Sequence, residues 1–200
     1  MTKVITIDQV DLRKIKILLD NSGLIAFPTE TVYSLSCNAL DDKSISKIYK
    51  IKERDIMKPL SLLISNKKII NKIAYLSDIA IDLINKYMPG PLTIILKSKD
   101  NKLISPKINN FGSNIGVRIP NHEFSLKLLN YYGGVLVGTS VNISSEKAMT
   151  NANEIREAFN NKIDLIIDGG DSPLGIGSTI VDLTNDIPVV VRQGSLILNL

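Results

Sequence analysis

The chain has 200 residues, 24 basic and 20 acidic side chains, a formal net charge of +4, one cysteine and one histidine. This length is typical of one domain, and we expect residues 1–200 to form a single domain that folds without disulfides. One cysteine, Cys37, cannot build a disulfide framework or a cysteine-rich zinc site, and one histidine, His122, cannot build a multi-histidine metal site. We therefore expect no metal held by protein side chains.

The chain shows no segment that would direct it into a membrane. Its N-terminal segment MTKVITIDQVDLRK lacks the continuous apolar core of a signal peptide. No stretch approaches the roughly 20 apolar residues of a membrane span. We expect a cytoplasmic protein without a membrane partner.

Apolar spacing and turn residues predict alternating strands and helices in the first half of the chain. Ser77 is a suitable N-cap, and the run Pro89-Gly90-Pro91 ends the helix that follows it. The expected elements are a strand at 4–7, a helix at 10–19, a strand at 24–27, a helix at 43–51, a strand at 60–64 and a helix at 78–88.

The second half continues the alternation, with β-branched runs as strands and glycines or asparagines at helix ends. The expected elements are strands at 92–96 and 115–119, a helix at 123–132, a strand at 135–138, a helix from Asn151 to 159, and strands at 165–167, 179–183 and 189–191. This order predicts an α/β fold with a sheet covered by helices. The short turn at 185–186 predicts antiparallel pairing of the last two strands, whereas the strand order stays open.

Residues 43–72 carry nine basic side chains against two acidic ones. A field of this sign attracts phosphate groups, either of a nucleotide or of a nucleic acid. The simpler alternative is that these lysines lie on solvated helix faces of a lysine-rich chain. Both interpretations stay open at this stage.

Polar segments follow several expected strands, where ligands collect in α/β sheets. Residues 28–33 (PTETVY) come directly after a buried strand and can orient a small ligand or form a turn. Residues 52–60 (KERDIMKPL) bring Lys52, Arg54 and Lys58 together before the next strand. Lysine and arginine suit phosphates, although an ordinary basic loop has the same composition.

Arg118 stands among apolar residues in a strand that should be buried. A buried arginine needs an anionic partner, which could be a protein carboxylate or a substrate carboxylate. In residues 138–142 (GTSVN) the strand period places Ser140 and Asn142 on one face. The chain has neither a GxxxxGK[ST] loop nor a GxGxxG fingerprint, so neither a P-loop nor a Rossmann site is indicated.

Seven segments of the chain resemble the motifs of the YrdC/TsaC family, the threonylcarbamoyl-AMP synthases, and stand in the family's order. One such motif would be weak evidence, whereas seven in register are highly specific. The segments are PTETVY at 28–33, KxRxxxKPL at 52–60, PGPLT at 89–93, GVRIP at 116–120, TSxN at 139–142, GSTIVD at 177–182 and RQG at 192–194.

The resemblance implies a twisted mixed sheet with flanking helices around a basic central cavity. It implies synthesis of threonylcarbamoyl-AMP and pyrophosphate from L-threonine, bicarbonate and ATP, with Mg²⁺ accompanying ATP. The product would serve formation of N6-threonylcarbamoyladenosine at position 37 of tRNA. A separate transferase complex would complete that step, so tRNA and the complex are expected as indirect partners.

By motif position, the resemblance also implies site residues. Threonine would bind at Thr31, Lys58, Arg118 and Ser178. ATP would lie among Lys52, Arg54, Asn114, Ser140, Asn142, Thr150 and Arg192. The residues implied for catalysis are Lys52, Arg54, Ser140 and Asn142. The hypothesis therefore requires that four cations distant in sequence surround one hollow, namely Lys52, Arg54, Arg118 and Arg192.

The chain departs from the family pattern at three positions. Ser34 and Ser145 stand where the family usually has glycine, so we expect local strain if the backbone there needs φ > 0°. Asp55 stands where proline is frequent and could weaken the positive field. The chain also looks like the short form of the family, without the C-terminal domain of the longer branch.

Two other functions are alternatives to this one. The first is a non-catalytic module that binds double-stranded RNA or tRNA through the basic face at 43–72. The second is a carbamoyl-adenylate-forming domain of the hydrogenase-maturation type, whose cysteine-rich zinc motifs and acylphosphatase domain are absent from this sequence.

Overall fold

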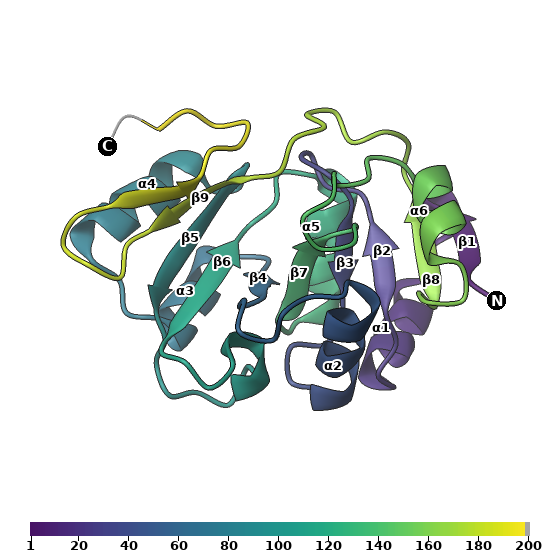
Figure 1. Ribbon diagram of the computed structural model, residues 1–200, viewed down its shortest axis with the longest axis horizontal. Coiled ribbons are helices and arrows are strands. Elements are labelled where there is room, and N and C mark those ends of the chain that lie inside the picture. The colour runs from purple at the N-terminus through teal and green to yellow at the C-terminus, as the bar shows by residue number, and fades with distance from the viewer. Residues whose placement is uncertain (199–200) are drawn as a thin grey trace.

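The computed structural model describes residues 1–198 as a twisted mixed sheet with helices on both faces (Figure 1). The helices are α1 (Leu12–Asp20), α2 (Asp42–Ile51), α3 (Lys67–Ile73), α4 (Asp78–Tyr87), α5 (Glu123–Tyr132) and α6 (Ala152–Phe159), with short 3₁₀ helices η1 (Ile7–Gln9) and η2 (Pro106–Asn109). The strands are β1 (Lys3–Thr6), β2 (Ile25–Phe27), β3 (Ser34–Ser36), β4 (Ser61–Leu63), β5 (Leu92–Lys97), β6 (Asn114–Arg118), β7 (Leu136–Ser140), β8 (Leu165–Asp168), β9 (Thr179–Asp182) and β10 (Val189–Arg192).

The sheet has the strand order β1-β8-β2-β3-β7-β4-β6-β5-β9-β10. The sheet contains both parallel pairs, such as β2 with β8 and β4 with β6, and antiparallel pairs, such as β3 with β7. The predicted α/β class with a twisted mixed sheet is confirmed. The predicted antiparallel pairing of the last two strands, β9 and β10, is also correct.

The middle of the sheet brings distant segments together. β7 pairs with β3 through Ser34 and Ser140, and with β4 through Ser61 and Gly138. The ends of β3, β4 and β7 therefore meet at one place, although they lie far apart in sequence. Figure 1 shows this meeting point between the β5–β6–β9 end of the molecule and the β1–β8–α6 end.

Both faces of the sheet are buried at its centre. In β2, Ile25 and Phe27 pack in a cluster with α1 and α5, whereas Ala26 packs in the larger cluster with α2 and α6. Because successive strand side chains point to opposite faces, a strand buried on both sides reads as a continuous apolar run. This explains why residues 24–27 could be predicted as a strand without any polar alternation.

Most predicted elements are present, with shifts of one or two residues at their ends. The helix predicted at 10–19 begins at Leu12, because Asp11 is its N-cap and accepts a hydrogen bond from the Arg13 amide. The strand predicted at 135–138 continues to Ser140. Besides the short 3₁₀ helices η1 and η2, two elements were not predicted, β3 and α3. β3 has the sequence Ser-Leu-Ser and exists because it pairs with two neighbours.

None of the helices within residues 1–198 is long and apolar enough to cross a membrane. The single domain expected over residues 1–200 stays a prediction, and residues 199–200 lie outside the described part of the chain.

Candidate functional site

A cavity of about 320 Å³ opens where β3 and β4 begin and β7 ends. Its lining comes from the segment after β2, the turn after α2, strands β4 to β7, the segment after β7, the loop before β9, and β10. Several residues implied by the resemblance line this cavity, namely Arg54, Arg118, Ser140, Asn142, Ser178 and Arg192. Hydrogen-bond donors and positive charge dominate this set, so the cavity suits an anionic ligand.

Arg118 lies at the end of β6 and is 7% exposed. Its Nη2 is 2.8 Å from the Oε1 of Glu30, its Nη1 donates to the Thr31 hydroxyl, and its Nε donates to the Gly90 carbonyl. Burial lowers the pKa of Arg118, and the neighbouring Glu30 carboxylate opposes that shift. A protein carboxylate is therefore one partner of this arginine, and the arginine still lines the cavity.

Arg54 and Arg192 complete a triad of arginines around the cavity. Arg54 donates from Nε to the Lys58 carbonyl and from Nη2 to the Pro59 carbonyl. Arg192 donates from Nε and Nη2 to the Ser178 carbonyl. Burial lowers the pKa of Arg192, and the charges of Arg118 and Arg54 lower it further. All three arginines line the same cavity, so three of the four cations expected around one hollow share it.

Lys52 does not line the cavity. It is the C-cap of α2, is 1% exposed, and donates three hydrogen bonds, to the Ser140 carbonyl and to the carbonyl and side-chain oxygens of Asn142. Its own carbonyl accepts from the Ser144 amide. Burial lowers the pKa of Lys52 to about 7, and the Arg54 charge acts in the same direction. Lys52 thus holds in place the segment of Ser140 and Asn142, which forms one wall of the cavity, without lining the cavity itself.

The wall that Lys52 holds carries Ser140 and Asn142. The Ser140 hydroxyl donates to the Asn142 side-chain oxygen, and the Asn142 side-chain amide donates to the Glu146 carbonyl. The two polar side chains do lie together as predicted, although the strand ends at Ser140 and Asn142 belongs to the segment after it. Beyond β7 the chain turns back at Ser145, whose φ of 73° is in the left-handed region.

The three departures from the family pattern have different consequences. Ser145 carries the expected strain, because a residue with a side chain rarely adopts φ > 0°. Ser34 carries none, because it lies in the extended strand β3. Asp55 accepts a hydrogen bond from the Met57 amide and is exposed, so it shapes the turn between Arg54 and Lys58.

Four other residues implied by the resemblance lie outside the cavity lining. Thr31 is fully buried and accepts a hydrogen bond from Arg118. Lys58 is exposed. Asn114 pairs with Lys97 at the start of β6. Thr150 donates its amide to the Glu154 carboxylate and accepts at its carbonyl from the Ser172 amide.

No individual binding role was predicted for Thr93 or Glu146, whereas Tyr33 belongs to the segment 28–33 that was expected to orient a ligand. Thr93 exchanges a 2.7 Å hydrogen bond with the Ser178 hydroxyl, and the Tyr33 hydroxyl donates to the Gly170 carbonyl. Glu146 is the carboxylate among the lining residues. The available signal for Thr93 was a hydroxyl within an otherwise apolar strand. Glu146 gave no signal, because it lies in a polar segment without periodicity.

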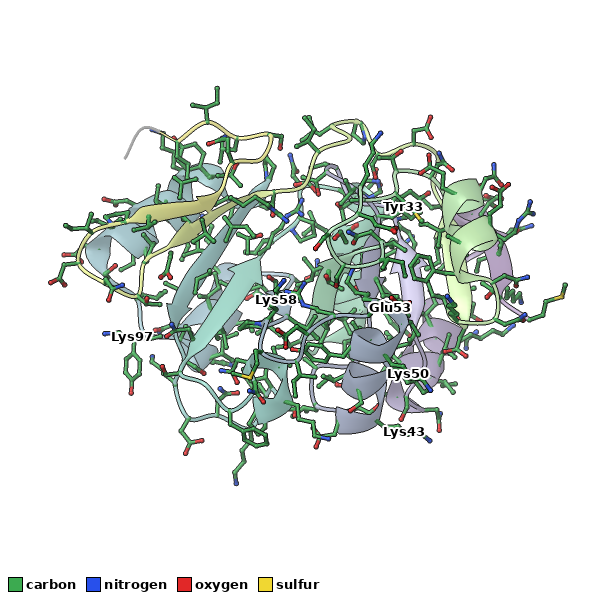
Figure 2. The ribbon with its side chains drawn as sticks, viewed as in Figure 1. Tyr33, Lys43, Lys50, Glu53, Lys58 and Lys97 are labelled. Atoms are coloured by element: carbon green, nitrogen blue, oxygen red, sulfur yellow. The ribbon has the colours of Figure 1, made fainter. Side chains whose placement is uncertain are left out.

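Apart from Arg54, the basic residues of 43–72 do not line the cavity. Figure 2 shows Lys43 and Lys50 along α2, with Lys43 at the end farther from Tyr33, and Lys58 apart from both. Lys43 and Lys50 are exposed, and the Lys47 ammonium donates to the Ser22 carbonyl. From this segment only Arg54, Pro59, Ser61 and Leu63 line the cavity. Its lysines therefore fit the simpler interpretation of solvated helix faces.

No group of three or more His, Cys, Asp or Glu side chains within residues 1–198 could hold a metal ion. His122 is the N-cap of α5 and accepts at Nδ1 from the Ser125 amide, and burial lowers its pKa. Cys37 is buried, which raises the pKa of its thiol to about 12. Both side chains have roles in packing and capping.

The chain is similar to known proteins over nearly its whole length. It is 35% identical to a threonylcarbamoyl-AMP synthase of Pyrococcus abyssi over 98% of this chain and 58% of the relative. It is 37% identical to a putative threonylcarbamoyl-AMP synthase of Methanocaldococcus jannaschii over 87% of this chain and 81% of the relative. The structure of P. abyssi Sua5 complexed with L-threonine matches with a TM-score of 0.90 and 34% identity, over 98% of this chain and 58% of that one.

The chain spans about three fifths of the length of the Pyrococcus relative. The sequence model of the Sua5/YciO/YrdC family, described as "Telomere recombination", matches residues 17–194. That range includes every element from the middle of α1 to β10 and all three arginines of the cavity. The chain therefore belongs to the Sua5/YciO/YrdC family.

Proposed function

We propose that this chain is a nucleotidyltransferase that makes threonylcarbamoyl-AMP and pyrophosphate from L-threonine, bicarbonate and ATP. The observation that carries the proposal is the meeting of Arg54, Arg118 and Arg192 at one cavity. ATP and threonine both carry negative charge, and three guanidinium groups that repel one another are stabilised by anions between them. The relatives named threonylcarbamoyl-AMP synthase support the choice of substrates.

The reaction needs no nucleophile from the protein. The threonine amine and bicarbonate condense to a carbamate with release of water. A carbamate oxygen then forms a bond to the α-phosphorus of ATP, and the bond from that phosphorus to pyrophosphate breaks. The protein contributes proximity and electrostatic stabilisation. This agrees with a cavity whose lining includes neither cysteine nor histidine.

We assign the threonine carboxylate to Arg118, with Ser178 beside it, and the phosphates of ATP to Arg54, Arg192, Ser140 and Asn142. Lys52 acts on the phosphates only through the wall that it fixes. Roles for Lys58, Asn114 and Thr150 require these side chains to reach a bound ligand, so they stay predictions. Thr31 is proposed to act on threonine through Arg118.

Mg²⁺ fits this cavity as a companion of ATP. Glu146 is the acidic side chain of the lining, so most ligands of the metal would be phosphate oxygens and water. The product would pass to a transferase complex that modifies adenosine 37 of tRNA.

The proposal is tested by incubating the chain with labelled bicarbonate, ATP and each amino acid in turn. We expect pyrophosphate release that depends on bicarbonate and is largest with threonine. Absence of that release, together with tight and salt-sensitive RNA binding, would support the RNA-binding alternative instead. Release that needs carbamoyl phosphate in place of threonine and bicarbonate would support the hydrogenase-maturation type of reaction.

A further inference from the structure

Glu30 is a buried carboxylate with a single close charged partner. The residue is 8% exposed, and one of its oxygens lies 2.8 Å from Nη2 of Arg118. Neither oxygen receives a directed hydrogen bond from any residue in 1–198. A buried carboxylate is usually satisfied by several hydrogen bonds, because its desolvation is costly. The contact with Arg118 is therefore the main interaction that Glu30 provides.

The residue after Glu30 orients the same guanidinium. The Thr29 hydroxyl donates to the Val32 carbonyl, so the 2.9 Å contact between the Thr29 and Thr31 hydroxyls uses the proton of Thr31. The Thr31 oxygen can then only accept, and it accepts from Nη1 of Arg118 at 2.8 Å. The segment after β2 thus contacts Arg118 at two nitrogens, Nη1 and Nη2, and at Nη1 the arginine must be the donor.

The third nitrogen of Arg118, Nε, donates to the Gly90 carbonyl at 3.2 Å. A guanidinium binds a carboxylate best through two parallel N–H groups, so its orientation decides how well it recognises one. Contacts at all three nitrogens determine that orientation before a ligand arrives. Of these contacts, only Glu30 also supplies a charge.

We propose that Glu30 is a positioning residue, which sets the angle and charge of Arg118 for the carboxylate of the amino-acid substrate. This inference rests on the proposed function, because it assigns that carboxylate to Arg118. The substrate carboxylate takes no part in bond making, so its binding is the same in the ground state and the transition state. Loss of such uniform binding raises KM and leaves kcat nearly unchanged.

The test compares Glu30→Gln with Glu123→Gln in the amino-acid-dependent release of pyrophosphate. The glutamine has the shape of glutamate without its charge, and Glu123 is a matched control, because it lines the same second cavity as Glu30 without contacting Arg118. We expect KM for threonine to rise at least about tenfold in Glu30→Gln, with kcat within about threefold of the parent chain. The control should keep both constants, and KM for ATP should stay unchanged in both variants.

A second variant separates positioning from folding. Glu30 lines a second cavity of about 880 Å³, distinct from that of the arginines, so Glu30→Ala leaves a gap that a small anion can enter. Added formate should lower KM for threonine in Glu30→Ala, whereas formamide, which has the same shape without charge, should not. Unchanged threonine KM in Glu30→Gln, or equal rescue by formamide, would overturn the inference. If the parent chain itself releases no threonine-dependent pyrophosphate, the proposed function fails instead.

Discussion

Two arginines that line one cavity differ in their place in the sheet: Arg118 is on an inner strand and Arg192 is on an edge strand. Arg118 lies on β6, between β4 and β5 in the sheet, and is 7% exposed with contacts at all three nitrogens. Arg192 ends β10, the last strand of the sheet, whose residues are all exposed. It is held by the carbonyl and hydroxyl of Ser178.

The two arginines differ in how the chain aims them. The register of β10 against β9 shifts between Val190 and Arg192, so a bulge turns Arg192 towards Ser178 and the cavity. Arg118 needs no bulge, because a buried carboxylate and a hydroxyl fix it from the segment after β2. An arginine whose orientation is fixed in advance suits a small ligand of fixed shape. An arginine on an edge strand suits a flexible triphosphate. The following predictions test that distinction.

The largest effect is expected from Arg118→Met, which removes the charge that compensates Glu30. Breaking a buried ion pair from one side leaves an unpaired charge and costs about 3–5 kcal/mol in free energy of unfolding. Urea denaturation measures this loss. In the double variant with Glu30→Gln the loss should be smaller than the sum of the two single losses. Additive losses would show that the two side chains do not interact.

The next effect is expected from Lys52→Met. The resemblance implies an ATP contact for Lys52, and in the structure its ammonium donates to Ser140 and Asn142, which line the cavity. Loss of the three hydrogen bonds should lower pyrophosphate release by about 10²-fold, because the wall loosens. It should also lower the free energy of unfolding by about 1–3 kcal/mol, which loss of a phosphate contact alone would not do.

Lys52 also predicts how stability depends on pH. Its pKa is lowered from 10.5 to about 7 by burial, so between these values the unfolded chain binds this proton and the folded chain releases it. The unfolded state binds more protons in that window, and the free energy of unfolding should therefore rise with pH. Denaturation at several pH values should give a steeper rise in the parent chain than in Lys52→Met. Equal slopes would contradict a lowered pKa.

A smaller and more selective effect is expected from Arg192→Gln. Because Arg192 lies on an exposed edge strand, its loss should change the free energy of unfolding by no more than about 0.5 kcal/mol. It should raise KM for ATP by about tenfold or more and leave KM for threonine nearly unchanged. Arg156→Gln, on the exposed face of α6, is the control. A large decrease in the free energy of unfolding would mean that Arg192 contributes to folding as much as Arg118 does.

The smallest effect is expected from Lys58→Ala. The resemblance implies a threonine contact for Lys58, but its side chain is exposed, and its carbonyl is the group that holds Arg54 and Tyr49. Removing the side chain keeps that carbonyl, so pyrophosphate release should change by less than about twofold. A rise in KM for threonine of tenfold would instead show that Lys58 reaches the bound substrate.

Local sequence patterns were enough to predict the class of fold, most helices and strands, and the motifs that contain the cavity residues. Periodicity and caps act over a few residues, so Ser77 and Asn151 marked the starts of α4 and α6 correctly. Ser140 and Asn142 were expected together, and their side chains are hydrogen-bonded, although the strand ends at Ser140. The candidate cations could also be named from the sequence, because lysine and arginine ordinarily carry charge at neutral pH, whereas the lowered pKa of buried Lys52 depends on the fold.

Which of these cations line the cavity depends on the tertiary structure. Lys52 and Arg54 are two residues apart, yet one lies behind the wall and the other lines the cavity. The pairing of Arg118 with Glu30, 88 positions away in the chain, and the existence of β3 depend on the strand order, which local patterns do not contain. Burial and pairing are set by neighbours from other strands, and only the assembled sheet supplies them.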